Sequence, residues 1–281
     1  MSQLKTVFFG ASTILVSDGT SSILVDGFFT RPPLLKLFTK ISPDEATIDR
    51  ALVRAGIQSL EMVVVSHSHA DHALDAPIVA QKTGALLAGT ESTRMIALGY
   101  GVGDTNFVPL ADGIPRKVGV FTVTPIRALH SENDRYPGEI STPVKLPAKT
   151  SAFRTGGCFS FHFDHPEGRI LVHPTANFIP GALDDYPSDV IFLGAGGAGL
   201  QDQRWRNRYW DETVVATGAY TVLPIHWDRF WRPLEEPLRP LPKSMDVLED
   251  TIIDWQIRAN AAHLDLRMPQ PCVEDLVRVR H

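Results

Sequence analysis

The stretch Met62–Pro77 reads MVVVSHSHADHALDAP, and it decides the fold class of this chain. Its apolar, β-branched start is typical of a buried strand. The strand ends abruptly in His67, His69, Asp71 and His72. Residues two apart in an extended segment point to the same side, so His67 and His69 can face one metal ion. Asp71 and His72 follow at once and can turn toward an adjacent ion.

These ligand types indicate which metal is expected. Nitrogen and carboxylate ligands without a thiolate favour zinc and also suit manganese or iron. A catalytic ion keeps one position open for water, so about three protein ligands per ion are expected. Two further histidines close strand-like segments: His130 follows VTPIRAL and His226 follows YTVLPI. Their position alone fits a metal ligand and an ordinary polar residue equally well.

The composition is that of an ordinary globular protein. Of 281 residues, 43% are hydrophobic and 21% are charged, and the formal net charge is −5. This balance argues against nucleic acid as a partner and leaves a small-molecule substrate. Cys158 and Cys272 are far apart and form no CxxC pattern, which fits a cytoplasmic protein. No apolar run approaches the roughly 18 residues that span a bilayer, so we expect no stable membrane insertion.

Short apolar runs and turns divide the chain into two similar halves of a single domain, residues 1–281. The first half has a hairpin around Ser-Asp-Gly-Thr that ends in ILVD, and the second has a hairpin around HPEG that ends in ILVH. A buried strand follows each hairpin. Two such α/β halves packed sheet to sheet place helices outside and strands inside. We expect strands at 6–10, 13–17, 22–26, 61–66, 118–130, 158–164, 169–173, 189–193 and 220–225.

Helices are predicted at 43–56, 77–84, 201–217 and 246–258. Ser42 is the expected N-cap of the first helix, and Asp75 can cap the second. Residues 28–42 are interpreted as a loop with a short helical piece, 130–155 as a long surface loop, and 232–242 as irregular. GAGGAG, at 194–199, lacks the spacing of a dinucleotide loop, so it predicts a tight passage of backbone past the metal centre.

The motifs together resemble the metallo-β-lactamase superfamily, and within it the branch that includes the ascorbate-phosphate lactonase. The resemblance spans nearly the whole chain. Its most specific part is HSHADH. The supporting motifs are ILVDGFFTRP (23–32), HALDAP (72–77), GALLAGTEST (84–93), SDVIFLGAGG (188–197) and PIHWDRFWRPL (224–234).

The resemblance implies a four-layer αββα sandwich with a metal site at the sheet edges. It also implies two ligand sets. One set is His67, His69 and His130, and the other is Asp71, His72 and His226.

One departure from the family pattern concerns the second half. Many members carry a Gly-Asp-Thr there whose aspartate bridges two ions, whereas this chain continues ILV as HPTAN, residues 173–177. Loss of a bridging anion removes favourable charge from between two dications. Three alternatives follow: the second ion binds weakly, is absent, or uses His173. The competing interpretation of His173 is a histidine satisfied by hydrogen bonds at a strand end.

Further candidates surround this centre. Asp26 is expected to accept a hydrogen bond from a ligand imidazole, with a turn-capping role as the alternative. Phe28, Arg31 and Trp227 are candidates for substrate contact, although core packing is the stronger interpretation of the aromatic residues. The apolar segment Phe28–Phe38 fits a lid or pocket wall, or an oligomer contact. Arg31, Arg135 and Lys145 are candidates for binding a substrate anion, with surface charge as the stronger interpretation.

The leading functional hypothesis is metal-dependent hydrolysis. A bound ion lowers the pKa of its water toward about 7, which supplies hydroxide for attack on a carbonyl carbon or a phosphorus atom. Asp71 would orient that water or bind a second ion. A small-molecule lactone, ester or amide is the first substrate class, and a phosphodiester, including a lipid one, is the second. The competing class is a non-catalytic binding member of the same fold.

Overall fold

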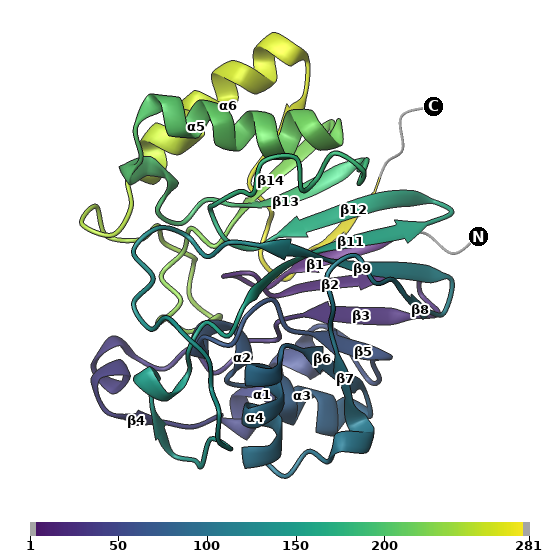
Figure 1. Ribbon diagram of the computed structural model, residues 1–281, viewed down its shortest axis with the longest axis vertical. Coiled ribbons are helices and arrows are strands. Elements are labelled where there is room, and N and C mark those ends of the chain that lie inside the picture. Colours follow the sequence, from purple (N-terminus) through teal and green to yellow (C-terminus); the bar gives the residue numbers. More distant parts are fainter. Residues whose placement is uncertain (1–3, 278–281) are drawn as a thin grey trace.

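Two seven-stranded sheets form the centre of the computed structural model, which describes residues 4–277 (Figure 1). The first sheet has the order β16-β1-β2-β3-β5-β6-β7. Its strands are β1 (Lys5–Phe8), β2 (Ile14–Ser17), β3 (Ser22–Val25), β5 (Met62–Val64), β6 (Leu86–Gly89), β7 (Phe107–Pro109) and β16 (Glu274–Leu276).

The second sheet has the order β15-β14-β13-β12-β11-β9-β8. Its strands are β8 (Arg116–Val118), β9 (Phe121–Ala128), β11 (Cys158–His165), β12 (Gly168–His173), β13 (Val190–Gly194), β14 (Thr221–Ile225) and β15 (Asp265–Leu266). A small separate sheet pairs β4 (Lys40–Ile41) with β10 (Ala148–Lys149).

Helices cover the outer face of each sheet (Figure 1). The first sheet carries α1 (Glu45–Arg54), α3 (Ala76–Thr83) and α4 (Glu91–Gly99), and the single turn α2 (Ala70–Ala73) lies beside α3. The second carries α5 (Gln203–Trp210), which continues as a π-helical turn, Asp211–Val215, and α6 (Leu248–Ala262). The predicted αββα sandwich is therefore confirmed.

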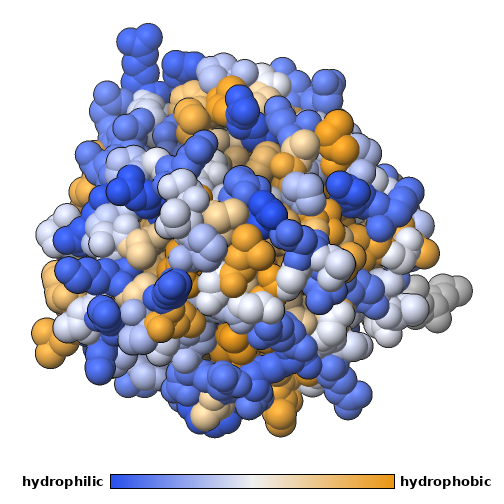
Figure 2. All heavy atoms as spheres, turned by 60° about the horizontal axis from the view of Figure 1, so that its bottom comes forward, coloured by the Kyte–Doolittle hydropathy of each residue, from blue (hydrophilic) through white to orange (hydrophobic). Residues whose placement is uncertain are grey.

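Three apolar clusters hold the four layers together. The central cluster joins the two sheets through residues such as Val64, Phe161, Phe163 and Ile225, all fully buried. The outer clusters pack each helix layer on its own sheet. Full burial of such side chains stabilises the fold by about 1.5–3 kcal/mol each. Figure 2 shows the end that carries the first helix layer, where hydrophilic side chains predominate and apolar ones are visible in smaller groups.

Strand direction brings the ends of both halves to one edge of the sandwich. In the first sheet β3, β5 and β6 are parallel, and in the second β12, β13 and β14 are parallel. β9 runs antiparallel to β11, which runs antiparallel to β12, so β9 also ends at this edge. The segments that follow β5, β9 and β14 therefore meet there. These segments carry His67, His130 and His226.

Hydrogen bonds at the starts of two helices correct one prediction and refine another. The N-cap of α1 is Asp44, whose side chain accepts a hydrogen bond from the Thr47 amide, and not Ser42. Asp75 occupies the N-cap position of α3 as predicted, but its carboxyl accepts hydrogen bonds from the amides of Phe29 and Thr30 and none from the helix. The short helical piece expected within 28–42 is the 3-10 turn Leu34–Phe38.

No helix within residues 4–277 is long and apolar enough to cross a membrane.

Candidate metal centre

The first candidate metal site consists of His67, His69 and His130. One ligand atom from each residue lies within 4.8 Å of those of the other two. Nε2 of His67 lies 3.2 Å from Nδ1 of His69, and the His130 ring centre lies 4.9 Å from that of His67 and 4.7 Å from that of His69. The end of β5 and the end of β9, from opposite sheets, bring these imidazoles together.

The second candidate site consists of Asp71, His72 and His226, which meet the same distance criterion. The turn α2 places Asp71 and His72 in adjacent positions. Nε2 of His226 lies 3.0 Å from Nε2 of His72 and 3.4 Å from a carboxylate oxygen of Asp71. His226 has a left-handed φ of 55°, and its amide donates to the carbonyl of Ala11. The chain after β14 therefore turns sharply to present this imidazole.

Asp26 lies where a supporting carboxylate was predicted. One oxygen lies 2.8 Å from Nδ1 of His72, and the other accepts a hydrogen bond from the Ser66 amide. Because a carboxylate only accepts, Nδ1–H of His72 is the donor, and the lone pair on its Nε2 faces His226 and Asp71. Asp26 is fully buried and has a left-handed φ of 61°. The sequence did not reveal Ser12, whose hydroxyl also contacts this carboxylate.

A loop from the second half orients His69. Nε2 of His69 lies 3.3 Å from the Tyr136 carbonyl and 3.2 Å from a carboxylate oxygen of Asp134. Both partners accept, so Nε2 carries the proton and Nδ1 faces His67. Thr155 hydrogen bonds with Asp134 and lies 3.2 Å from the same Nε2. Sequence reasoning missed Asp134, Tyr136 and Thr155, and the only signal was the length of the loop 130–155.

Burial keeps the imidazoles of the first site unprotonated. It lowers the pKa of His67 well below its usual value, lowers that of His69, and lowers that of His130 to about 4. Neutral imidazoles are the form that binds metal. Burial also tends to raise the pKa of Asp71, but His72 and His226 outweigh it and hold that pKa far below its usual value.

The second site favours positive charge. Burial on its own lowers the pKa of His226, but the hydrogen bond to Asp71 and the charge of that carboxylate raise it overall. The ionised Asp71 thus stabilises a proton or a metal cation at this point. Three imidazoles in one group, and two imidazoles with a carboxylate in the other, match the donor sets of divalent zinc, manganese or iron. The residues therefore fit a metal centre.

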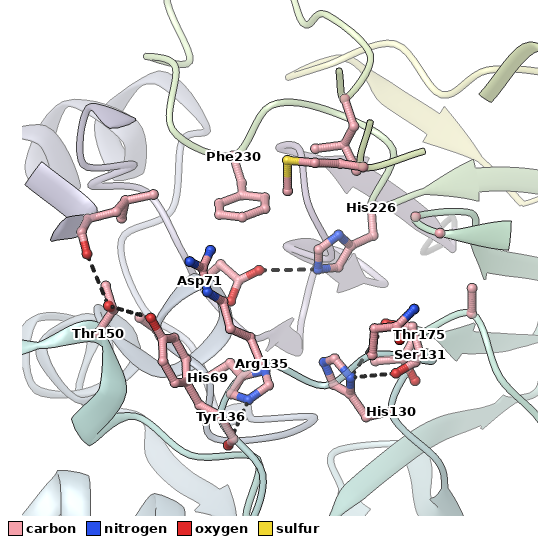
Figure 3. A pocket seen from close by; sticks show the side chains of 18 of the residues that line it. His69, Asp71, His130, Ser131, Arg135, Tyr136, Thr150, Thr175, His226 and Phe230 are labelled. Carbon is pink, nitrogen blue, oxygen red and sulfur yellow. Dashed lines mark hydrogen bonds and ion pairs between the residues drawn. The ribbon is translucent and has the colours of Figure 1, made fainter. Parts of the chain in front are cut away.

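A pocket of about 430 Å³ opens above the two groups (Figure 3). Its floor includes His69, Asp71, His130 and His226. Figure 3 shows these side chains converging from opposite sides, with Phe230 above them. This volume falls within the range typical of small-molecule sites.

His173 lies apart from both groups. Its Nε2 donates to the Asn177 carbonyl at 2.6 Å, which leaves Nδ1 to accept from the Ser160 hydroxyl at 2.7 Å. Both ring nitrogens are therefore engaged, and burial lowers the pKa of His173 to about 4. This geometry fits the hydrogen-bonded histidine at a strand end and gives no support to His173 as a replacement for the bridging aspartate.

The three candidates for substrate contact have different surroundings. Phe28 lines the pocket. Arg31 is buried and pairs with Asp228, which is also buried, so its charge is already neutralised. Trp227 is 8% exposed and donates its indole N–H to the Pro224 carbonyl. Neither Arg31 nor Trp227 is among the described residues that line the pocket, which corrects their predicted placement.

The glycine-rich segment passes the metal centre as predicted. A Cβ atom on Gly196 would lie 2.4 Å from the carbonyl oxygen of His226, and one on Gly194 would lie 2.7 Å from that of Pro174. Real Cβ contacts are essentially never this short, so only glycine allows this approach. The segment therefore supports the turn that presents His226.

Comparisons with known proteins agree with this geometry. The sequence pattern of the Metallo-beta-lactamase superfamily matches residues 6–174. A UPF0173 metal-dependent hydrolase of Methylobacterium nodulans is 30% identical over 51% of this chain. The match covers 55% of that relative, so this chain spans about half of the relative's length. A UPF0173 metal-dependent hydrolase of Staphylococcus carnosus is 23% identical over 81% of this chain and 86% of the relative.

Solved structures share the fold along the whole chain. The metallo hydrolase Igni18 of Ignicoccus hospitalis superposes with a TM-score of 0.64 at 15% identity, covering 99% of this chain and 100% of that structure. An isothiocyanate hydrolase from Delia radicum gut bacteria has a TM-score of 0.61 at 11% identity, covering 98% and 100%. The matched pattern covers more than half of the sequence, and this chain therefore belongs to the metallo-beta-lactamase superfamily.

Proposed function

We propose that this protein is a metal-dependent hydrolase that cleaves a small-molecule lactone, ester or amide. The observation that carries the proposal is the pair of three-residue groups that each place two members on the floor of one pocket. His67, His69 and His130 would hold one ion, and Asp71, His72 and His226 a second. Zinc is the first candidate, with manganese or iron as alternatives.

The ion and the protein have separate tasks in this proposal. A bound divalent ion supplies a Lewis acid and lowers the pKa of water toward about 7. Asp71 lines the pocket and stays ionised at neutral pH, so it can accept a hydrogen bond from the attacking water and orient it. Asp26 fixes the ring orientation of His72, and the Tyr136 carbonyl fixes that of His69.

The substrate class rests on the pocket and on the resemblance in sequence. A pocket of about 430 Å³ accommodates a small molecule. The resemblance of the chain's motifs to the ascorbate-phosphate lactonase branch supports lactones and esters as the first candidates. The exposed apolar residues Leu34 and Phe38, which line the pocket, keep a lipid phosphodiester as the second candidate.

Metal analysis combined with a hydrolysis panel tests the proposal. The purified protein is expected to contain stoichiometric metal and to turn over a lactone or a nitrophenyl ester faster than bis-nitrophenyl phosphate. His69→Ala is expected to lose metal and activity together. His162→Gln, which changes a histidine of β11 outside the pocket, is the matched control and should keep both. Metal without turnover of any substrate would favour a non-catalytic binding protein instead.

A further inference from the structure

Arg135 presents a cation to the pocket and has no carboxylate partner among the residues that the structure describes. It lines the pocket, and the carbon of its guanidinium lies 5.9 Å from the centre of the Tyr136 ring. Asp71 lines the same pocket, but its ion-pair contacts are with His72 and His226. Glu132 is also in the lining, yet within residues 4–277 it forms no ion pair with Arg135. The positive charge of Arg135 is thus available to a ligand.

Tyr136 fixes this cation relative to the metal centre. Its carbonyl accepts a hydrogen bond from His69, and its ring supports Arg135. Its hydroxyl lies 3.3 Å from the hydroxyl of Thr150, which donates to the carbonyl of Leu37. Figure 3 shows this chain of contacts from Thr150 through Tyr136 toward His69, with Arg135 beside it. One residue therefore links the metal ligand, the cation and the segment that contains Leu37.

That segment forms an apolar wall of the pocket. Leu34, Leu37 and Phe38 belong to the 3-10 turn Leu34–Phe38 and line the pocket together with Phe230. Leu34 is 46% exposed and Phe38 is 70% exposed, although both are large and apolar. A ligand with an apolar chain would cover this surface, and each CH₂ group that it buries there would add about 0.8 kcal/mol to binding.

We propose that the pocket selects an amphipathic anion: Arg135 binds a carboxylate or phosphate group, and the wall formed by Leu34, Leu37 and Phe38 binds an apolar chain. This inference rests on the proposed hydrolase function and names the substrate class within it. A neutral lactone or ester of the same length lacks the charge that Arg135 recognises. The preferred substrate therefore carries both a bond to be cleaved at the metal centre and a separate anionic group.

Binding of non-hydrolysable probes tests the subsite without requiring turnover. Calorimetry on the metal-loaded protein would compare octanoate, octyl phosphate and the neutral 1-octanol, and the two anions distinguish carboxylate from phosphate recognition. Arg135→Gln is expected to weaken binding of the preferred anion by roughly 10- to 100-fold, the range of charge-assisted hydrogen bonds, and to leave binding of 1-octanol unchanged. Phe38→Ser is expected to weaken octanoate more than butanoate.

Metal content is measured for every variant, because anions also bind metal directly. Arg116→Gln, an exposed arginine of β8 outside the pocket, is the matched control and should bind all probes as the wild type does. Unchanged octanoate and octyl phosphate affinities in Arg135→Gln at full metal content would overturn the anion subsite. Arg135-dependent anion binding without hydrolysis of any substrate would support the subsite and reject the hydrolase.

A kinetic comparison adds a measurement of turnover. Of 4-nitrophenyl octanoate and the 4-nitrophenyl monoester of suberate, the second, which is anionic, is expected to show the lower KM.

Discussion

Arg31 and Asp228 form an ion pair in the protein interior, although 197 positions separate them in the sequence. Their side chains are 1% and 0% exposed. The other oxygen of Asp228 accepts a hydrogen bond from the Ala11 amide, and the Ala11 carbonyl accepts one from the His226 amide. The pair therefore ties the first half of the chain to the segment that presents His226.

Removal of one partner of this pair should be strongly destabilising. Asp228→Ala leaves Arg31 buried and unpaired, which typically costs about 3–5 kcal/mol. Urea unfolding with matched metal content measures the change. Glu235→Ala removes the exposed pair with Arg50 and should change the free energy of unfolding very little. If the free energy of unfolding of Asp228→Ala falls by less than about 1 kcal/mol, the buried pair does not stabilise the fold to the expected extent.

Asp26→Asn tests the support of the second metal site. Asparagine tolerates the left-handed φ of Asp26, but it removes the negative charge beside Nδ1 of His72. The second ion is expected to bind roughly tenfold more weakly, whereas the first site, whose three histidines do not contact this carboxylate directly, keeps its ion. Titration with a competing chelator resolves the two affinities.

Asp189→Asn is the matched control, because that carboxylate accepts from the Arg169 amide and has no contact with the metal ligands. An equal loss at both metal sites in Asp26→Asn would indicate general disruption rather than a specific role beside His72.

The sequence predicted those candidate site residues whose positions follow from the strand or turn that contains them. The motif from His67 to His72 contributes four candidate ligands because a strand end and one helical turn suffice to arrange them. His130 and His226 could be named as candidates because they also follow strands, and these strands end at the same edge. The two similar halves were predicted because alternating apolar runs and turns reflect short-range backbone preferences.

Other features depend on contacts between distant segments and were not predictable. Arg31 was a candidate for substrate contact because nothing in its neighbourhood reveals Asp228. Tyr136 and Asp134 lie in a loop without periodicity, so their contacts with His69 left no pattern. The strand Leu86–Gly89 and the following helix Glu91–Gly99 were not among the predicted elements.

Asp75→Asn should become more stable relative to the wild type as pH rises. Burial raises the pKa of Asp75 from 3.8 to about 6, so the folded state holds the proton more tightly than the unfolded state. The stability that the protonated Asp75 gives the folded wild type is fully present below about pH 4 and is lost as pH rises through about 6. Relative to the wild type, Asp75→Asn should therefore gain up to about 3 kcal/mol between pH 4 and 8.

Urea unfolding of the wild type and Asp75→Asn at several pH values measures this difference. Asparagine retains an acceptor for the amides of Phe29 and Thr30, so the hydrogen bonds change little. A difference between the two proteins that stays constant from pH 4 to 8 would contradict a raised pKa of Asp75.

His173→Gln should show the opposite pH dependence. Burial lowers the pKa of His173 to about 4, so the unfolded state binds a proton first as pH falls. The stability that the neutral imidazole contributes is present above its unfolded pKa, about 6.5, and is lost as pH falls toward 4. The advantage of the wild type over His173→Gln should therefore shrink by up to about 3 kcal/mol over this interval.

The same variant separates a structural histidine from a metal ligand. Both ring nitrogens of His173 are engaged by Ser160 and Asn177, so His173→Gln should bind as many metal ions as the wild type. His226→Gln, which removes a member of the second group, should lose an ion. Metal analysis at neutral pH, where both variants are folded, compares them directly. Loss of an ion in His173→Gln would mean that this residue does take the place of the bridging aspartate.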